Sequence, residues 1–374
     1  MSTAGNTQKS AKVELFISKE RQARFWMLVA FAAVIGFAWD RQNLVTKLGS
    51  KPLFFAMDAE TFYVSRLGTF EEAKLFHAEA SRMAAACLFD RILGQEEVIR
   101  EIVPILINGE LGINSEGKPK ANLLLLGPPG VGKTDICNVF TDYLLGSEKL
   151  IRFDMSEYQT VESIYRLLGH NGEEGLLGKN HDRVDGAGTL LFDEIEKAHE
   201  RVLDLFLQLL SAARITLGSG RVLNLEGFYV AATSNIGSPL LIGSKTNVRE
   251  TLVRRVLQEA QNQMRPEIFD RFDRVLVFNR LSYEVQIDVG RLHLSWEIEA
   301  QKRRGYRVRE WDAEALKAIV RNGYSEKQGA RRMRNAAREA VQEAIRDALL
   351  SGKEASGRLH YDGQSKAFFL NGQS

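Results

Sequence analysis

One octapeptide constrains the fold of this 374-residue chain more than any other feature. Residues 127–134 read GPPGVGKT and fit the pattern G-x-x-x-x-G-K-[ST]. The apolar run NLLLLG leads into it, and the helical stretch DICNVFTDYLL follows it. A strand, a glycine-rich turn and a helix in this order curl backbone amides round an anionic phosphate at the start of the helix. The pattern predicts a phosphate-binding loop in an α/β domain.

The residue types in this loop predict how a nucleotide is held. Glycines let the backbone approach the phosphates, Lys133 reaches the outer phosphates, and Thr134 ligates magnesium. We therefore expect a nucleotide with Mg²⁺ as cofactor. The loop residues expected to bind the nucleotide are Gly127, Pro128, Pro129, Gly130, Val131, Gly132, Lys133 and Thr134.

A second acidic motif supports this interpretation. Residues 189–194 read TLLFDE, which is an apolar strand ending in two carboxylates. We expect Asp193 to hold magnesium directly or through a water molecule, and Glu194 to polarise the attacking water. Such a pair at a strand end often only caps the next helix, but here it follows a phosphate loop in the same chain.

Five apolar runs predict the strands of the sheet. They alternate with helical stretches and are apolar throughout, as expected for parallel strands buried on both faces. The runs are 122–127, 150–154, 189–194, 228–235 and 275–279. After Leu281 the pattern is mostly helical to about residue 351, and the segments RLHYDG and KAFFL predict a terminal hairpin.

Charge and cysteine content exclude some classes of partner and site. Fifty basic and 48 acidic residues give a net charge of +2, so no global positive field attracts nucleic acid, and none is expected as a partner. The run QKRRGYRVR at 301–309 is interpreted as a solvated helix end. Cys87 and Cys137 are too few for a disulfide framework or a zinc cluster and are given no role.

Residues 25–39 form a charge-free apolar segment, FWMLVAFAAVIGFAW. As a helix this spans about 22 Å, against a hydrocarbon core about 30 Å thick. Trp26 and Trp39 bracket it as interfacial aromatics do, and Arg24 and Arg41 are placed to lengthen it by snorkelling. We expect a membrane anchor. The alternatives are a buried helix and the apolar part of a signal peptide.

Several motifs together resemble one protein family. LFDEIEKAHERVLDLFLQLL at 191–210 is similar to the corresponding stretch of Clp-type protein-remodelling ATPases of the AAA+ superfamily. The resemblance is closest to the second ATPase module of ClpA and ClpB and covers roughly residues 88–371. It also includes these motifs: DRILGQEEV at 90–98, FDMSEY at 153–158, ATSNIGS at 232–238, RPEIFDRFDRVLVF at 265–278 and GARRMRNA at 329–336.

The resemblance implies a fold and a set of roles. The fold is an AAA+ P-loop parallel-sheet domain, 88–280, followed by a small helical domain with a terminal β-hairpin, 281–374. A polar segment 1–24, the anchor 25–39 and a small module 40–87 precede them. The resemblance implies hydrolysis of ATP with Mg²⁺ in a six-subunit ring. Its implied site residues are Ile92 and Leu93 flanking the adenine, Asn235 as first sensor, Arg271 as arginine finger and Arg331 as second sensor.

The sequence departs from the family at the loop that threads polypeptide. The family uses Gly-Tyr-Val-Gly, whereas Gly175-Leu176-Leu177-Gly178 has leucine in place of the aromatic residue. This segment either grips substrate by apolar contact or is an ordinary glycine-rich loop. His170 and His181 are interpreted as loop residues, not metal ligands. The interval between first sensor and arginine finger is short, so no ClpP-type peptidase partner is expected.

Three functions remain open at the level of sequence. The first is a membrane-tethered, ATP-driven remodeller of proteins. The second is a scaffold of a membrane complex that assembles with ATP but threads no substrate, and the third is a DNA- or clamp-handling AAA+ protein. Residues 1–24 carry five basic and two acidic residues, which favours a cytoplasmic N-terminus, but hydrolysis needs ATP. We therefore expect the ATPase domain on the cytoplasmic side of a membrane (the inner membrane in a bacterium), with a cytoplasmic protein as the alternative.

Overall fold

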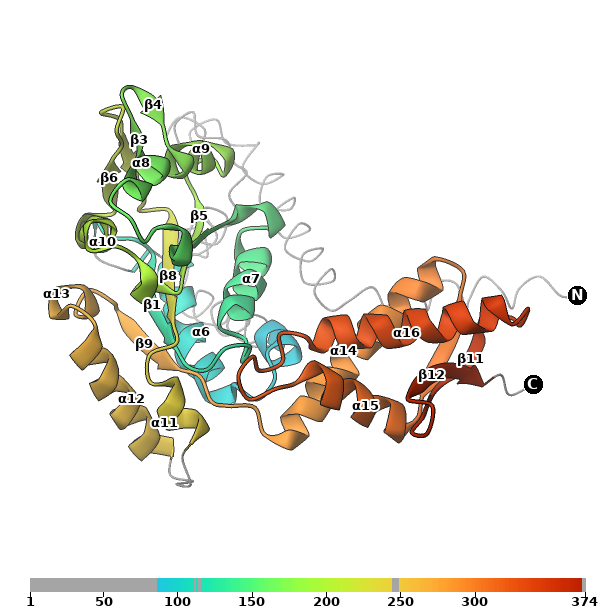
Figure 1. Ribbon diagram of the computed structural model, residues 1–374. Helices are drawn as coiled ribbons and strands as arrows, with labels where there is room; N and C mark the ends of the chain where they lie inside the picture. Colours follow the sequence, from blue (N-terminus) through green and yellow to red (C-terminus); the bar gives the residue numbers. More distant parts are fainter. Residues whose placement is uncertain (1–85, 111, 114–115, 244–248, 372–374) are drawn as a thin grey trace, which may run out of the picture.

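A five-stranded parallel sheet forms the centre of the computed structural model, which describes residues 86–110, 112–113, 116–243 and 249–371 (Figure 1). Its strand order is β2-β5-β8-β1-β9, and every neighbouring pair is parallel. The strands are β1 (Ala121–Leu126), β2 (Leu150–Asp154), β5 (Gly188–Asp193), β8 (Phe228–Ser234) and β9 (Arg274–Val277). The predicted parallel α/β fold is confirmed, and each predicted apolar run corresponds to a strand.

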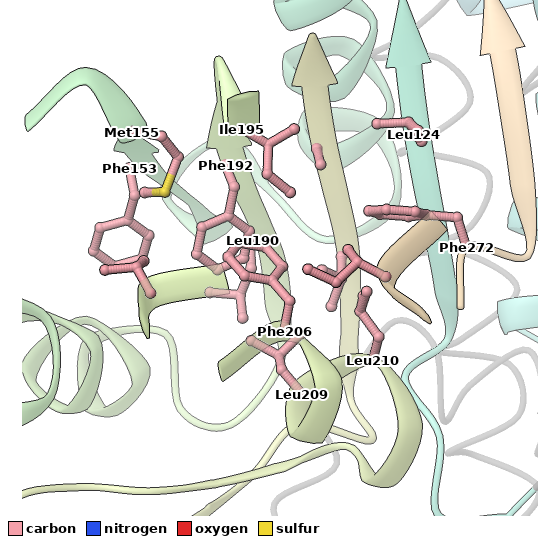
Figure 2. Packing of buried hydrophobic residues seen from close by; sticks show 14 of the residues in the cluster. Leu124, Phe153, Met155, Leu190, Phe192, Ile195, Phe206, Leu209, Leu210 and Phe272 are labelled. Atoms are coloured by element: carbon pink, nitrogen blue, oxygen red, sulfur yellow. The ribbon is translucent and has the colours of Figure 1, made fainter. Parts of the chain in front are cut away.

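Alternate side chains of these strands enter two separate cores. Leu124, Leu190 and Phe192 point to one face, where they pack against α10 (Glu200–Ala212) (Figure 2). Leu125 and Leu191 point to the other face, which is covered by α6 (Glu96–Glu110) and α7 (Lys133–Leu144). Since successive side chains of a strand alternate between faces, a sheet covered on both sides needs uninterrupted apolar runs.

The chain beyond the sheet forms a second body with its own core, drawn as the orange and red arm in Figure 1. It contains α14 (Tyr283–Arg303), α15 (Ala313–Gly323) and α16 (Met333–Leu350). The predicted hairpin is confirmed as β11 (Ser356–Asp362) and β12 (Ala367–Asn371), which pair antiparallel. β10 (Arg307–Trp311), which the sequence did not predict, pairs in parallel with β11. Because its residues alternate only weakly between buried and exposed, β10 is recognised as a strand only by its pairing with β11.

The remaining α-helices and two short hairpins of the first body surround the sheet. They are α8 (Ser163–Leu168), a hairpin of β3 (Gly169–His170) and β4 (Glu173–Glu174), α9 (Leu176–Arg183), a hairpin of β6 (Arg214–Thr216) and β7 (Val222–Asn224), α11 (Ser238–Ile242), α12 (Arg249–Gln263) and α13 (Pro266–Phe269). The two hairpins lie against each other, because Gly218 N donates to Leu168 O at 2.9 Å.

The structure corrects the expected loop Gly175-Leu176-Leu177-Gly178. Leu176 is the first residue of α9, and Leu177 is fully buried in the same apolar core as Leu190 and Phe192. A Cβ on Gly175 would lie 2.3 Å from the nitrogen of Gly169, so this glycine serves close packing against β3. The exposed turn is instead at 171–172, between β3 and β4. The prediction of a loop is wrong for this segment because its leucine side chains pack in or against the apolar core.

Candidate functional site

Three neighbouring strands of the sheet end at the predicted site. The glycine-rich loop follows β1, Asp193 ends β5, and Asn235 follows β8. The order β5-β8-β1 makes these strands adjacent, and parallel strands bring their carboxyl ends to one edge. Segments far apart in the sequence therefore meet there.

The glycine-rich loop leads directly into α7. Gly132 caps this helix with φ +104°, a conformation that favours glycine, and Lys133 is its first residue. Lys133 is 7% exposed, and its Nζ donates to the carbonyl oxygens of Gly127 and Pro128, the latter at 2.9 Å. Burial lowers the pKa of Lys133 to about 8, although the carboxylates of Glu196, Asp193 and Glu194 oppose the shift.

Asp193 is held from two sides. Its Oδ1 accepts a hydrogen bond from the Thr233 hydroxyl, and its Oδ2 forms an ion pair with Arg152 on β2. The next residue, Glu194, adopts φ +57° while its backbone nitrogen donates to Thr233 Oγ1 at 3.1 Å. Thr233 therefore contacts the carboxylate of Asp193 and the backbone of Glu194.

Asn235 connects the phosphate loop to the acidic pair. Its Oδ1 accepts from Lys133 Nζ at 2.9 Å, and its Nδ2 donates to Glu194 Oε1 at 3.3 Å. The backbone nitrogen of Asn235 donates to Glu196 Oε1 at 3.1 Å. One amide thus touches the cation expected at the phosphates and the carboxylate expected at the attacking water.

A loop of the second body closes over the glycine-rich loop. Ala330 N donates to Gly130 O at 3.0 Å. A Cβ on Gly329 would lie 2.2 Å from Pro129 O, and one on Gly130 would lie 2.2 Å from Gln328 O. Only glycines permit this approach, which brings Arg331 to the wall of the cavity.

The cavity between the two bodies has a volume of about 620 Å³. Its lining includes Lys133, Thr134, Asp193, Glu194 and Asn235. The lining also includes Ile92 and Leu93 together with residues of α14. Gln95, fully buried, fixes that segment by bonds from its Nε2 to Val131 O and Asn279 O at 3.3 and 2.9 Å.

These residues fit a nucleotide with magnesium. Glycine amides, Lys133 and Arg331 supply positive groups for phosphates, and the apolar side chains of the lining accept a base. Magnesium in nucleotide sites takes one or two protein oxygens and completes its shell with phosphates and water. Thr134 and Asp193 supply such oxygens. Nowhere in the part of the chain that the structure describes, this cavity included, could a cluster of three or more His, Cys, Asp or Glu side chains hold a metal ion by itself. When bound, Mg²⁺ would neutralise charge on the phosphates.

Three predicted site residues are absent from the lining of this cavity: Gly127 and Pro128, whose carbonyls accept from Lys133, and Arg271. The side chain of Arg271 is exposed, its Nε donates to Glu267 O at 3.0 Å, and its Nη1 donates to Ser211 Oγ. Within one subunit Arg271 therefore lies on a surface away from the phosphates.

Sequence reasoning missed three supporting residues: Arg152, Thr233 and Glu196. Arg152 lies on β2, one strand away from Asp193, and no local motif marks it. Thr233 lies two residues before Asn235 in the run ATSN. Its position near the end of the strand that leads to Asn235 was the one sequence signal that could have indicated its role. Glu196 follows the acidic pair by two residues and contacts Asn235 only through the tertiary fold.

Two family models match the chain. Residues 118–275 match an AAA domain described as of the Cdc48 subfamily, and residues 297–360 match the C-terminal D2-small domain of ClpB protein. The first match contains the glycine-rich loop and the acidic pair, and the second contains Arg331. Together they cover both bodies that form the cavity.

Curated relatives agree with these matches. The chain is 32% identical over 308 residues to a chaperone protein ClpB of Aquifex aeolicus, with 79% of this chain and 30% of the relative covered. It is 30% identical over 315 residues to a ClpA homologue of Cyanidium caldarium, named as an ATP-binding subunit of ATP-dependent Clp protease, with 79% and 36% covered. It is also 32% identical over 326 residues to chloroplastic chaperone protein ClpB3 of Arabidopsis thaliana, with 83% of this chain and 32% of the relative covered. The chain thus spans about a third of the length of these relatives.

The membrane location predicted from residues 25–39 is wrong on the comparison with these relatives. Within the described parts of residues 86–371, no helix has the length and apolar character that a bilayer crossing requires. The relatives carry names of chaperones and of a protease subunit, one of them chloroplastic. The segments 1–24 and 25–39 and most of the module 40–87 lie outside the described residues.

The glycine-rich loop, the strand order and the second body with its docked loop agree with the matched models and relatives. The chain is a Clp-type AAA+ ATPase, similar to the second ATPase module of ClpB and ClpA.

Proposed function

We propose that this chain is an ATP-hydrolysing ring motor that remodels protein substrates. The observation that carries the proposal is the amide of Asn235, which contacts both Lys133 and Glu194. A protein that only binds nucleotide needs Lys133 but does not need a polar group between the γ-phosphate site and an attacking water. The ClpB and ClpA relatives support the substrate class by their names.

The proposed roles follow the position of each side chain in the cavity. Lys133 and Arg331 bind phosphate oxygens, Thr134 and Asp193 hold magnesium, and Glu194 polarises water positioned by Asn235. Ile92 and Leu93 flank the base. Arg271 acts on the nucleotide of a neighbouring subunit, in a ring proposed to contain six subunits. We propose 88–280 and 281–374 as the two domains of the module.

The test is to measure phosphate release and unfolding of a fluorescent model protein with the full chain. Wild type is expected to do both in the presence of ATP and Mg²⁺. Glu194→Gln is expected to bind ATP and retain the model protein without release of phosphate, because the loop and Asp193 remain. Normal phosphate release by this variant would remove Glu194 from the mechanism and contradict the proposal.

A second function is favoured by the hairpin of β3 and β4. Its exposed turn carries Asn171 and Gly172, and Leu177 is buried in α9, so this edge presents no aromatic loop of the Gly-Tyr-Val-Gly kind. The second function is ATP-dependent assembly without threading. Hydrolysis and assembly by wild type with no unfolding of any model protein would select it. The absence of nucleic acid and of a ClpP-type peptidase as partners remains a prediction.

A further inference from the structure

The part of the cavity lined by α14 differs in chemistry from the glycine-rich loop and the acidic pair. The helix α14 contributes Val289, Leu292, His293 and Trp296 to the lining, which also includes Ile92. Three of these four α14 side chains are aliphatic or indole. His293 is the one whose ring carries two hydrogen-bonding nitrogens, so it adds a polar group to an otherwise apolar wall.

The ring of His293 is fixed in place by its neighbours. It packs edge-on against Trp296 with ring centroids 5.2 Å apart, and the Arg91 guanidinium lies 6.0 Å from the Trp296 ring. His293 Nδ1 is buried and has no hydrogen-bond partner among the residues that the structure describes. Buried N–H groups without an acceptor are rarer than buried acceptors without a donor, so the proton belongs on Nε2. His293 thus offers Nε2–H as its hydrogen-bond donor.

The imidazole is uncharged at neutral pH. Burial lowers the pKa of His293 to about 4, and the positive charge of Arg334 acts in the same direction. A charged imidazolium would be repelled by the Arg334 guanidinium and would attract phosphate. A neutral ring instead suits the uncharged heterocycle of a nucleotide.

We propose that His293 is a base-recognising residue, which donates a hydrogen bond from Nε2 to a ring nitrogen of the purine. The ring nitrogens N1, N3 and N7 of adenine are all acceptors, so a single neutral donor matches any of its edges. This inference rests on the proposed nucleotide-binding function of the same cavity. It assigns to α14 of the second body a direct part in choosing the base.

Binding of ADP analogues to the full chain tests the proposal without hydrolysis. Isothermal titration calorimetry would compare ADP with 1-deaza-, 3-deaza- and 7-deaza-ADP, each lacking one acceptor nitrogen. For wild type, one analogue is expected to bind about 2- to 10-fold more weakly than ADP, the range of one neutral hydrogen bond. His293→Phe, which keeps the ring volume, is expected to lose that penalty, and His293→Gln, which keeps an N–H donor, is expected to retain it.

Two outcomes would overturn the proposal. One is equal binding of ADP and all three analogues by wild type, which needs no variant. The other is a penalty that is the same in wild type and in a folded His293→Phe. Failure of the underlying function gives a different result: wild type would not bind ADP, or Lys133→Ala would bind it as tightly as wild type.

Discussion

At the scale of single residues, the site depends on side chains that contact two partners each. Thr233 forms hydrogen bonds with Asp193 and with the backbone of Glu194, and Asn235 forms hydrogen bonds with Lys133 and Glu194. Sharing of this kind fixes the distance between the phosphate-binding cation and the carboxylate before any nucleotide is present. A change in a shared residue should therefore affect turnover more than affinity.

Asn235→Ala is predicted to lower the rate of ATP hydrolysis by about 10²-fold, the cost of removing one positioned polar group from a reacting centre. ATP affinity should change little, because Lys133 and the glycine-rich loop remain. Steady-state phosphate release together with calorimetric ATP binding checks both parts.

The matched comparison for Asn235→Ala is Lys133→Ala, which removes the buried cation and should weaken nucleotide binding itself. Equal loss of affinity in the two variants would mean that Asn235 acts only through Lys133.

At the scale of elements, the contact between two glycine-containing loops joins the two bodies. Gly329 has φ +58°, and its Cα lies close to the Pro129 carbonyl, so the site in the first body is completed by a loop of the second. Arg331 reaches the cavity only through this contact. The glycines of the two loops therefore decide whether the second body can respond to nucleotide.

Gly329→Ala is predicted to destabilise the chain by about 2–5 kcal/mol. About 1–2 kcal/mol comes from a left-handed non-glycine residue, and about 1–3 kcal/mol comes from overpacking against Pro129. ATP affinity should also fall, because the loop that carries Arg331 is displaced. Denaturant unfolding and ATP titration measure the two effects.

Gly352→Ala is the control for backbone strain. Gly352 has a similar φ of +65°, but a Cβ there meets no atom within 4 Å. This variant should lose only about 1–2 kcal/mol and keep its ATP affinity. If the two variants lose the same stability and both keep their ATP affinity, the close approach of the two loops contributes nothing to stability or to ATP binding.

The start of α9 gives a second prediction at this scale. Leu177→Ala should cost about 2–5 kcal/mol of unfolding free energy, the usual range for a buried leucine, because Leu177 is 0% exposed in the core. Leu176→Ala, at a half-buried position one residue earlier, should cost much less. If both variants lose the same small amount of stability, residues 175–178 would again be interpreted as an exposed loop that grips substrate.

At the scale of the whole molecule, Arg271 makes a single subunit incomplete. It lies on the surface, away from its own cavity, where its partners are Ser211 and the Glu267 carbonyl. A head-to-tail contact in a closed ring would bring it to the nucleotide of the next subunit. The alternative is that Arg271 only stabilises the helix end beside it.

ATPase activity per subunit is predicted to rise with protein concentration until rings form. An arginine supplied by a neighbour is worth about 10³–10⁵ in rate in other phosphate-hydrolysing enzymes. Arg271→Ala subunits, inactive alone, should regain activity when mixed with Lys133→Ala subunits, which supply the arginine but cannot bind nucleotide. Activity that is constant on dilution, with no rescue on mixing, would describe a monomeric ATPase.

The parallel sheet, the nucleotide loop and the acidic pair could all be predicted from the amino-acid sequence. Local rules suffice for these features: a strand buried on both faces is apolar throughout, and a phosphate loop needs glycines followed by lysine and threonine. The run TLLFDE also indicated that Asp193 ends a strand, whereas Asn235 came from the resemblance to the Clp-type family. No knowledge of distant contacts was needed.

Which residues meet across the site, and which apolar segment is buried, depends on the tertiary structure. Arg152 reaches Asp193 because β2 and β5 are neighbours, and Leu177 is buried where α9 packs against α8 and β4. Gly329 approaches Pro129, and His293 and Ile92 line one cavity, because the second body packs against the first. Such contacts join residues far apart in the chain, and local propensity and periodicity carry no information about them because they arise from packing.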